Sequence, residues 1–320
     1  MKRRWPLQEF RRKAFLALLA VYALLLLLIC LQASGMLSRE TISVGAVSRS
    51  VTIKHVGETS TWDFEDIVLC VRKPFDRSAA RRSGPCDERR FIHGFPETGE
   101  ETADAPYDPK ERHSVTLGMH DGVVTTLTWE ADRGIWLDLD GHRSFETGAR
   151  IALSKEQWQR IGTLTFTGRA TIGAAAASGE DGILLSGNYE VRERSIFSRR
   201  TDSIKTGAFR RGDSVSLVGP DGSARVYGAV FPDDGGASST AFHVTLASSE
   251  ASAVKVSYFG AADPALIRAN LLDRATESPY ILALAFALSV LFGTAELLWP
   301  RCFPTSGRRD ASLVDDAEAP

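Results

Sequence analysis

The stretch IGTLTFTGRATIG, residues 161–173, alternates apolar and polar side chains along most of its length. Alternation with a period of two is the pattern of a β-strand that buries one face, and Thr and Ile suit that conformation. The run GILLSGNYEVRERSI, residues 182–196, has the same character, and the loop AAAASGED separates the two. Together they predict two long strands and decide the fold class of the middle of the chain.

Similar short runs fill residues 36–260, from TISVGAV near the start to AVKVSYFG near the end, with Gly- and Asp-rich turns between them. Strands that follow one another without long helices predict an all-β domain of the sandwich or barrel type. Two segments differ. Residues 74–111 are polar and without periodicity, which predicts a long loop, and SKEQWQRI predicts a short helix capped by Ser154.

The segment ADPALIRANLLDRATES, residues 261–277, predicts one more helix. Asp263 is a good N-cap residue, Pro264 suits the first helical position, and apolar residues follow at helical spacing. This juxtamembrane helix is expected to pack on the β domain and fix it against a membrane surface.

Two apolar runs flank the β domain and are each long enough to cross a bilayer as a helix. The first transmembrane helix is expected over residues 14–34 and the second over residues 279–299. A cleaved signal peptide is the alternative for the first run, although signal sequences usually have shorter apolar cores. A buried core helix is the alternative for the second.

The distribution of charge predicts the orientation of the two spans. Residues 1–13 hold six Lys and Arg residues against one Glu, and Arg301, Arg308 and Arg309 follow the second span. Basic residues next to a span stay in the cytoplasm. The basic segment 1–13 and the short tail 300–320 are therefore expected to be cytoplasmic, and the β domain periplasmic or extracellular, at a bacterial inner membrane.

Cysteine usage agrees with an oxidising compartment for the β domain. Cys30 lies in the first apolar run and Cys302 follows the second, so only Cys70 and Cys86 fall in the outer domain. An even pair in such a domain predicts a disulfide. Two unpaired thiols are the alternative.

A group of basic residues is the first candidate binding site. Arg199, Arg200, Arg210 and Arg211 are the residues expected to bind a partner or the phosphates of lipids or anionic glycans. Acidic residues are interleaved with them, so a solvated edge of mixed charge is the alternative. The chain has a net charge of −2 and no basic stripe, which argues against nucleic acid as a partner.

A second candidate is the stretch WLDLDGH, which places Asp138, Asp140 and His142 at alternating positions. On a strand these side chains share one face, and carboxylate and imidazole groups are metal ligands. A solvated strand that runs into an Asp-Gly turn is the alternative. We expect no cofactor.

The second apolar run holds two further features. Glu296 is an intramembrane carboxylate, which is a functional candidate, although its position near the end of the run also permits snorkelling to the interface. Gly293-Thr294-Ala295 offers a face of small residues for helix packing. The expected partners are therefore the lipid bilayer and either another protein or a second copy of this chain.

Several stretches resemble the GIDE-type, or "beside a membrane", domain of organelle-anchored ubiquitin ligases and their prokaryotic relatives. These stretches are GAVSRSV (45–51), YEVRERSI (189–196), RRGDSVSLVG (210–219) and VKVSYFGAADPALIRANLLDR (254–274). The resemblance implies a first span, an outer domain and a second span. FSRRTDSIKTGAF looks like an insertion relative to that family. The ligase members of that family carry a zinc-binding RING after the second span, and a RING needs about eight Cys and His ligands. Cys302 is the only Cys or His after residue 300, so the expectation is that the tail does not form a RING.

The sequence therefore predicts a doubly anchored, non-catalytic envelope protein whose β domain binds a protein, lipid or glycan. One alternative is an extracytoplasmic metal-dependent hydrolase that uses Asp138, Asp140 and His142. Another is an accessory subunit of a larger membrane complex, held by its transmembrane helices.

Overall fold

The computed structural model describes residues 5–34, 36, 38–57, 61–78, 86, 89–93, 103–107, 114–120, 124–130, 135–137, 143–145, 150–173, 183–195, 200–232, 241–258, 261 and 263–302. The chain divides into two compact units. One is the β unit, Ser38–Asp273, and the other combines the residues before Ser38 with those from Arg274 onward.

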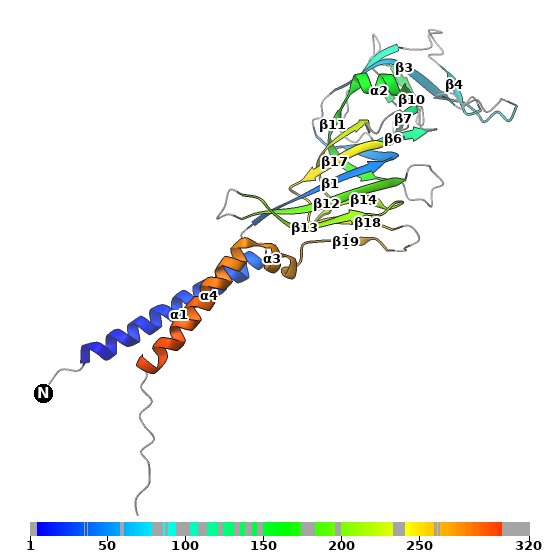
Figure 1. Ribbon diagram of the computed structural model, residues 1–320. Helices are drawn as coiled ribbons and strands as arrows, with labels where there is room; N and C mark the ends of the chain where they lie inside the picture. The colour runs from blue at the N-terminus through cyan, green and yellow to red at the C-terminus, as the bar shows by residue number, and fades with distance from the viewer. Residues whose placement is uncertain are drawn as a thin grey trace, which may run out of the picture. The chain divides into compact units, whose positions relative to one another are not determined.

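Two long apolar helices make up most of the second unit. They are α1 (Trp5–Ala33) and α4 (Pro279–Cys302), which pack against each other (Figure 1). Within them Lys13–Gln32 and Pro279–Leu297 are long and apolar enough to span a membrane, by length and composition. Large apolar side chains such as Leu24 and Phe286 are exposed on their surfaces. These features make a membrane location plausible, and the length, composition and N-terminal position of the first helix also fit a signal sequence.

Antiparallel pairing joins seventeen of the described strands into one sheet, and β8 and β9 form a separate two-stranded sheet. The prediction of a mostly β domain is therefore confirmed. The strands are β1 (Ser38–Ser48), β2 (Ser50–His55), β3 (Trp62–Arg72), β4 (Phe91–His93), β5 (Ala103–Tyr107), β6 (Ser114–His120), β7 (Val124–Glu130), β8 (Ile135–Leu137), β9 (Arg143–Phe145), β10 (Arg150–Ser154), β11 (Leu164–Ile172), β12 (Leu184–Ser195), β13 (Asp202–Phe209), β14 (Ser214–Gly219), β15 (Gly222–Ser223), β16 (Val226–Pro232), β17 (Phe242–Ser248), β18 (Ala253–Ser257) and β19 (Ala265–Ile267).

Nine strands form an antiparallel half-barrel. Two series of strands leave the same edge of β11: β16-β17-β1-β12-β13 from residues 164–168, and β14-β18-β19 from residues 171–172. Strands β13 and β19 are therefore the two ends of the half-barrel. A second arm of the sheet leaves β11 in the order β2-β6-β7-β10-β3, and β4 and β5 pair with β3. Strand β11 thus connects the half-barrel to the second arm.

Gly168 lies in the part of β11 that has strands on both edges. It lies opposite Val226 of β16 on one edge and opposite His55 of β2 on the other. A Cβ atom at this position would collide with the backbone carbonyl oxygen of Lys54. The close approach of β2 therefore requires glycine in the middle of the strand, where glycine otherwise weakens a sheet.

Inward-facing residues of both parts of the sheet share one large hydrophobic core, as the period-two patterns predict. Helix α2 (Lys155–Ile161) contributes Trp158, whose indole contacts the ring of Phe242 with centroids 5.5 Å apart. Ser154 caps this helix: its hydroxyl accepts the N–H of Gln157, whose side chain accepts the N–H of Ser154. The short helix and its cap are confirmed.

The single helix predicted over residues 261–277 is wrong in extent. Residues Ala265–Ile267 form β19 instead, and the helix α3 spans only Leu271–Glu277. Its N-cap is Asn270 rather than Asp263, because Asn270 and Asp273 exchange side-chain to backbone hydrogen bonds of 2.7 and 2.9 Å. Pairing with β18 satisfies the backbone before Asn270 in the sheet, which competes with helix formation. Helix α3 has no buried residue, and Lys205 of β13 contacts it through Asp273.

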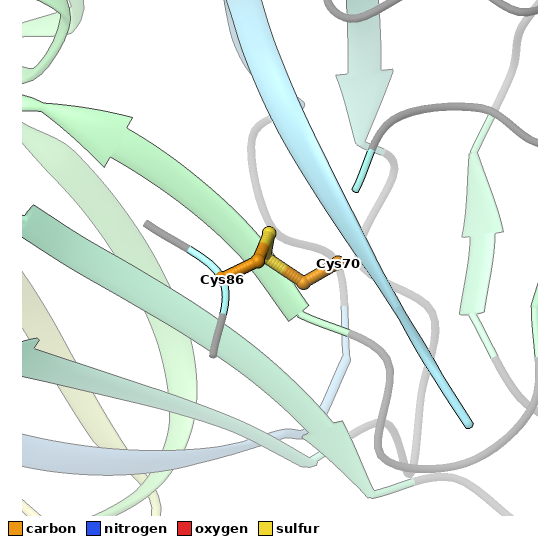
Figure 2. Close-up of a disulfide and its surroundings, with 2 residues drawn as sticks. All are labelled: Cys70 and Cys86. Carbon is orange, nitrogen blue, oxygen red and sulfur yellow. A yellow bond between two sulfur atoms is a disulfide. The ribbon is translucent and has the colours of Figure 1, made fainter. Parts of the chain in front are cut away.

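A disulfide joins Cys70 of β3 to Cys86, with 5.5 Å between their Cα atoms (Figure 2). This confirms the predicted pair. Both cysteines are buried in a small satellite core with Phe91 and Ala152. The predicted loop over residues 74–111 is partly wrong, because the short strands β4 and β5 fall within it and pair with β3.

Candidate functional site

The two edges of the half-barrel define the candidate site, which we call the seam. Strand β13 pairs with β12 along one edge, and β19 pairs with β18 along one edge. Among the strands that the structure describes, no pairing joins β13 or β19 to a strand on its other edge. Unpaired N–H and C=O groups at a strand edge can bind another strand.

A tight turn between β13 and β14 shapes one end of the seam. The carboxylate of Asp213, which is 3% exposed, accepts the backbone N–H of Arg210 at 2.7 Å. Gly212 has a φ of 88°, a conformation that favours glycine, and its N–H donates to the carbonyl of Leu184 at 2.8 Å. The buried carboxylate therefore fixes the turn, and Arg210 and Arg211 remain exposed on it.

A hollow of about 430 Å³ opens beside this turn. Apolar side chains from both sides of the seam form much of its wall, and Arg210, Asp213 and Tyr258 add polar groups. The ring of Tyr189 packs across Gly207, where a Cβ atom would clash with it, and contacts Phe209 at a centroid distance of 5.5 Å. The lining residues are Tyr189, Ala208, Phe209, Arg210, Asp213, Val256, Tyr258 and Ile267.

An ion pair joins the two sides of the seam at its other end. The Nζ of Lys205 donates to Oδ2 of Asp273 at 2.7 Å and to the carbonyl of Arg268 at 3.0 Å. The Asn270 backbone N–H is the largest cause that lowers the pKa of Asp273, and Lys205 lowers it further. Lys205 thus holds the chain after β19 against β13.

Acidic residues lie side by side at the same end of β12. Glu193 is 4% exposed and has Glu40 of β1 opposite on one side and Asp202 of β13 on the other. Burial raises the pKa of Glu193, a hydrogen bond from Ser38 opposes the shift, and the charge of Asp202 adds to it. Negative charge is therefore disfavoured at Glu193 in the folded protein.

A second, shallower hollow of about 530 Å³ lies over β12, β1, β17 and β16. Gly45 and Gly228 contribute to its floor, and Asn188, Glu190 and Tyr227 to its sides. Arg192 binds Glu190 at 2.6 Å, and this hydrogen bond is the main cause that lowers the pKa of Glu190. All four strands here are already paired on both edges, so this hollow offers side chains but no unpaired backbone.

The structure divides the predicted arginine site. Arg199 lies outside the described residues, Arg200 precedes β13, and Arg210 and Arg211 follow it. A rise of about 3.3 Å per residue separates Arg200 from Arg210 by roughly 30 Å. These arginines therefore do not form one compact patch, and only Arg210 lines the hollow at the seam.

The other predicted site residues add nothing to the seam. Asp138, Asp140 and His142 lie outside the described residues, within which no group of metal-binding side chains occurs. Glu296 is exposed on α4. A Cβ atom added to Gly293 would meet no atom within 4 Å, so this glycine makes no close helix contact within the described chain.

Sequence reasoning missed most of the seam. The strand β13 falls in FSRRTDSIKTGAF, which was interpreted as an insertion relative to the GIDE-type family and not as a strand. Tyr189 and Phe209 are ordinary core residues by pattern. Lys205 and Asp273 are too far apart in sequence to be recognised as a pair.

Comparison of the chain with protein-family models, curated proteins and solved structures finds no match.

Proposed function

We propose that this is a doubly anchored membrane protein whose β unit binds an extended segment of a protein partner at the seam. The observation that carries the proposal is that β13 and β19 each leave one edge unpaired within the described residues, with a hollow between them. A segment that adds to the edge of β13 satisfies backbone groups there, and the hollow accepts one of its apolar side chains. Recognition by strand addition combines these two contributions.

The dimensions of the seam limit what it can bind. Lys205 occupies one end through its contacts with Arg268 and Asp273. Residues 206–209 of β13 remain, which is about 13 Å of strand. The site therefore suits a short extended segment of about four residues rather than a whole strand of a partner domain.

The rim of the hollow suggests the charge of the partner segment. Arg210 lines the hollow and is exposed, whereas Asp213 is buried and holds the turn through the backbone of Arg210. The guanidinium is thus the accessible charged group there. A carboxylate, either a side chain or a chain terminus, is its best partner because arginine binds carboxylates with two hydrogen bonds.

The location belongs to the same proposal. Two apolar helices support membrane anchoring, the basic residues before Ala14 support cytoplasmic termini, and the Cys70–Cys86 disulfide supports an oxidising compartment for the β unit. A bacterial inner membrane with the β unit outside the cytoplasm satisfies all three. The resemblance to GIDE-type proteins adds the same order of span, outer domain and span, and it remains part of the proposal.

Photocrosslinking in cells tests the proposal. A benzoylphenylalanine at Ala208, beside the hollow, is expected to crosslink to a protein, and the same group at Arg169, exposed on β11, is expected not to. Ala208→Trp fills the hollow and should abolish co-purification of that protein in mild detergent. Arg210→Glu should weaken it most at low salt. Crosslinks to lipid alone, or equal crosslinks at both positions, would contradict a protein partner at the seam.

A further inference from the structure

The end of the β unit that connects to the apolar helices carries a second surface. Leu271 and Leu272 are 62% and 70% exposed, and Leu266 is 52% exposed. Arg39, Arg194 and Arg268 are exposed in the same part of the unit. Exposed leucines beside arginines are typical of a surface that meets the interface of a bilayer, where both groups are stabilised.

The two leucines are held rigidly in spite of their exposure. Lys205 binds the segment on both sides of them, through the carbonyl of Arg268 and the carboxylate of Asp273. Asn270 and Asp273 exchange two further hydrogen bonds around the first turn of α3. An apolar environment would stabilise an ordered turn that presents two adjacent leucines at its surface, because burying their apolar area is favourable.

The arginines form an arrangement that an anion would stabilise. Arg39 of β1 lies directly opposite Arg194 of β12, and both side chains are exposed. Like charges at directly opposed positions on neighbouring strands destabilise a sheet. Phosphate groups between or beside the two guanidinium groups remove that repulsion and make charge-assisted hydrogen bonds.

Chain length keeps both groups close to the apolar spans. Leu272 precedes the span that begins at Pro279 by seven residues, most of them helical in α3, which corresponds to about 10 Å. Arg39 follows Gln32, the last residue of the other span, by seven residues, which reach at most about 25 Å. The headgroup layer on each side of a bilayer is roughly 5–8 Å thick, so the leucines can reach it.

We propose that this surface docks the β unit onto a bilayer that contains anionic phospholipid. Leu271 and Leu272 insert at the level of the headgroups, and Arg39, Arg194 and Arg268 bind lipid phosphates. The inference rests on the proposed membrane anchoring, and it does not depend on a partner at the seam. The surface lies at the end of β13 opposite Arg210 and Arg211, so the lipid-bound arginines are different from those at the hollow.

Depth-dependent fluorescence quenching in the full chain tests the docking. The chain carries Cys30→Ser and Cys302→Ser and is reconstituted into vesicles of phosphatidylcholine with about a third phosphatidylglycerol, a strongly anionic mixture. An environment-sensitive label is attached at Leu272→Cys or, as the matched control, at Arg211→Cys. Brominated lipids are expected to quench the label at position 272 several-fold more strongly than the label at position 211.

The arginines are tested in the same preparation. Arg39→Glu with Arg194→Glu should reduce quenching at position 272, and replacing phosphatidylglycerol by phosphatidylcholine should have a similar effect. Equal quenching at positions 272 and 211, in protein that still resists extraction from the vesicles, overturns the docking while leaving the anchoring and the seam intact. A label at 272 that reports an apolar environment without lipid quenching also overturns it, because a protein then covers the leucines.

Discussion

Glu193 is a single side chain whose protonation is expected to make the stability of the half-barrel depend on pH. Its carboxyl group is buried, and burial is the main cause that raises its pKa above the ordinary value of 4.5. The titratable groups that face it are Glu40 on β1 and Asp202 on β13. The folded protein therefore binds the proton of Glu193 more tightly than the unfolded chain does.

The sign of the resulting effect on stability follows from this preference. The contribution of Glu193 to stability is fully present below pH 4.5 and is lost as the pH rises through the higher pKa of the folded protein. Glu193→Gln removes the charge and keeps an oxygen that can accept the hydrogen bond of Ser38. The variant should unfold at a higher temperature than the wild type at neutral pH and at nearly the same temperature below pH 4.5, measured by circular dichroism in mild detergent.

Glu190 is the matched control for this experiment, because it lies on the same strand with a pKa shifted in the opposite direction. The hydrogen bond from Arg192 lowers its pKa, so its contribution is present above pH 4.5 and is lost as the pH falls. Glu190→Gln should therefore lower the unfolding temperature slightly at neutral pH. If both variants change it in the same direction, local electrostatics at Glu193 are not the cause.

Among the individual elements, the Cys70–Cys86 disulfide has the most direct consequence for stability. It closes a loop with a sequence separation of 16 next to β3 and β10, and such a loop corresponds to about 3 kcal/mol in the chain-entropy account. Cys70→Ala with Cys86→Ala should lower the unfolding temperature by several degrees and make it insensitive to reductant. The wild type and Cys30→Ser should both remain sensitive. A wild type with unchanged unfolding in reductant would mean that the bond adds no stability.

Local sequence signals predicted the elements whose determinants are local. Ser154 and Gln157 define both ends of a capping box, and α2 begins where they place it. Asp263 and Pro264 give an equally good local signal, but the residues after them pair with β18 and the helix begins at Leu271. A long-range pairing outweighed helix propensity there, and residue spacing does not reveal such pairings.

The difference between local and long-range determinants also explains why the sequence did not predict the seam. Alternation predicted β11 and β12, which are buried on one face, but β13 contains Gly207 and forms because β12 provides a partner edge. The hollow depends on Tyr189, Phe209 and Ile267, which come from three strands. Arg210 was predicted as a binding residue from charge alone, and its position beside the hollow follows from the turn that Asp213 holds.

At the scale of the whole molecule, the chain connects both ends of the β unit to apolar helices. Ser38, the first residue of that unit, pairs with Ser195 of β12, and Asp273, the last, is bound by Lys205 of β13. Both connections are therefore held by neighbouring strands, β12 and β13. In the proposed function, two membrane anchors restrict the tilt of the β unit more than a single anchor does, which suits the proposed binding of a partner at a fixed height.

The proposed topology places both termini in the cytoplasm and retains both helices. Alkaline phosphatase, which is active only outside the cytoplasm, should be active when inserted after Asp181 and inactive when fused after Pro320, because the basic residues before Ala14 and after Trp299 stay inside. A fluorescent protein that folds only in the cytoplasm should give the reverse result.

These fusions do not distinguish an anchor from a cleaved signal sequence, since α4 alone also returns the C-terminus to the cytoplasm. An epitope tag placed before Met1 makes that distinction: it should remain on the mature protein in the membrane fraction. Loss of the tag would leave a singly anchored protein, and phosphatase activity at Pro320 would refute the topology itself.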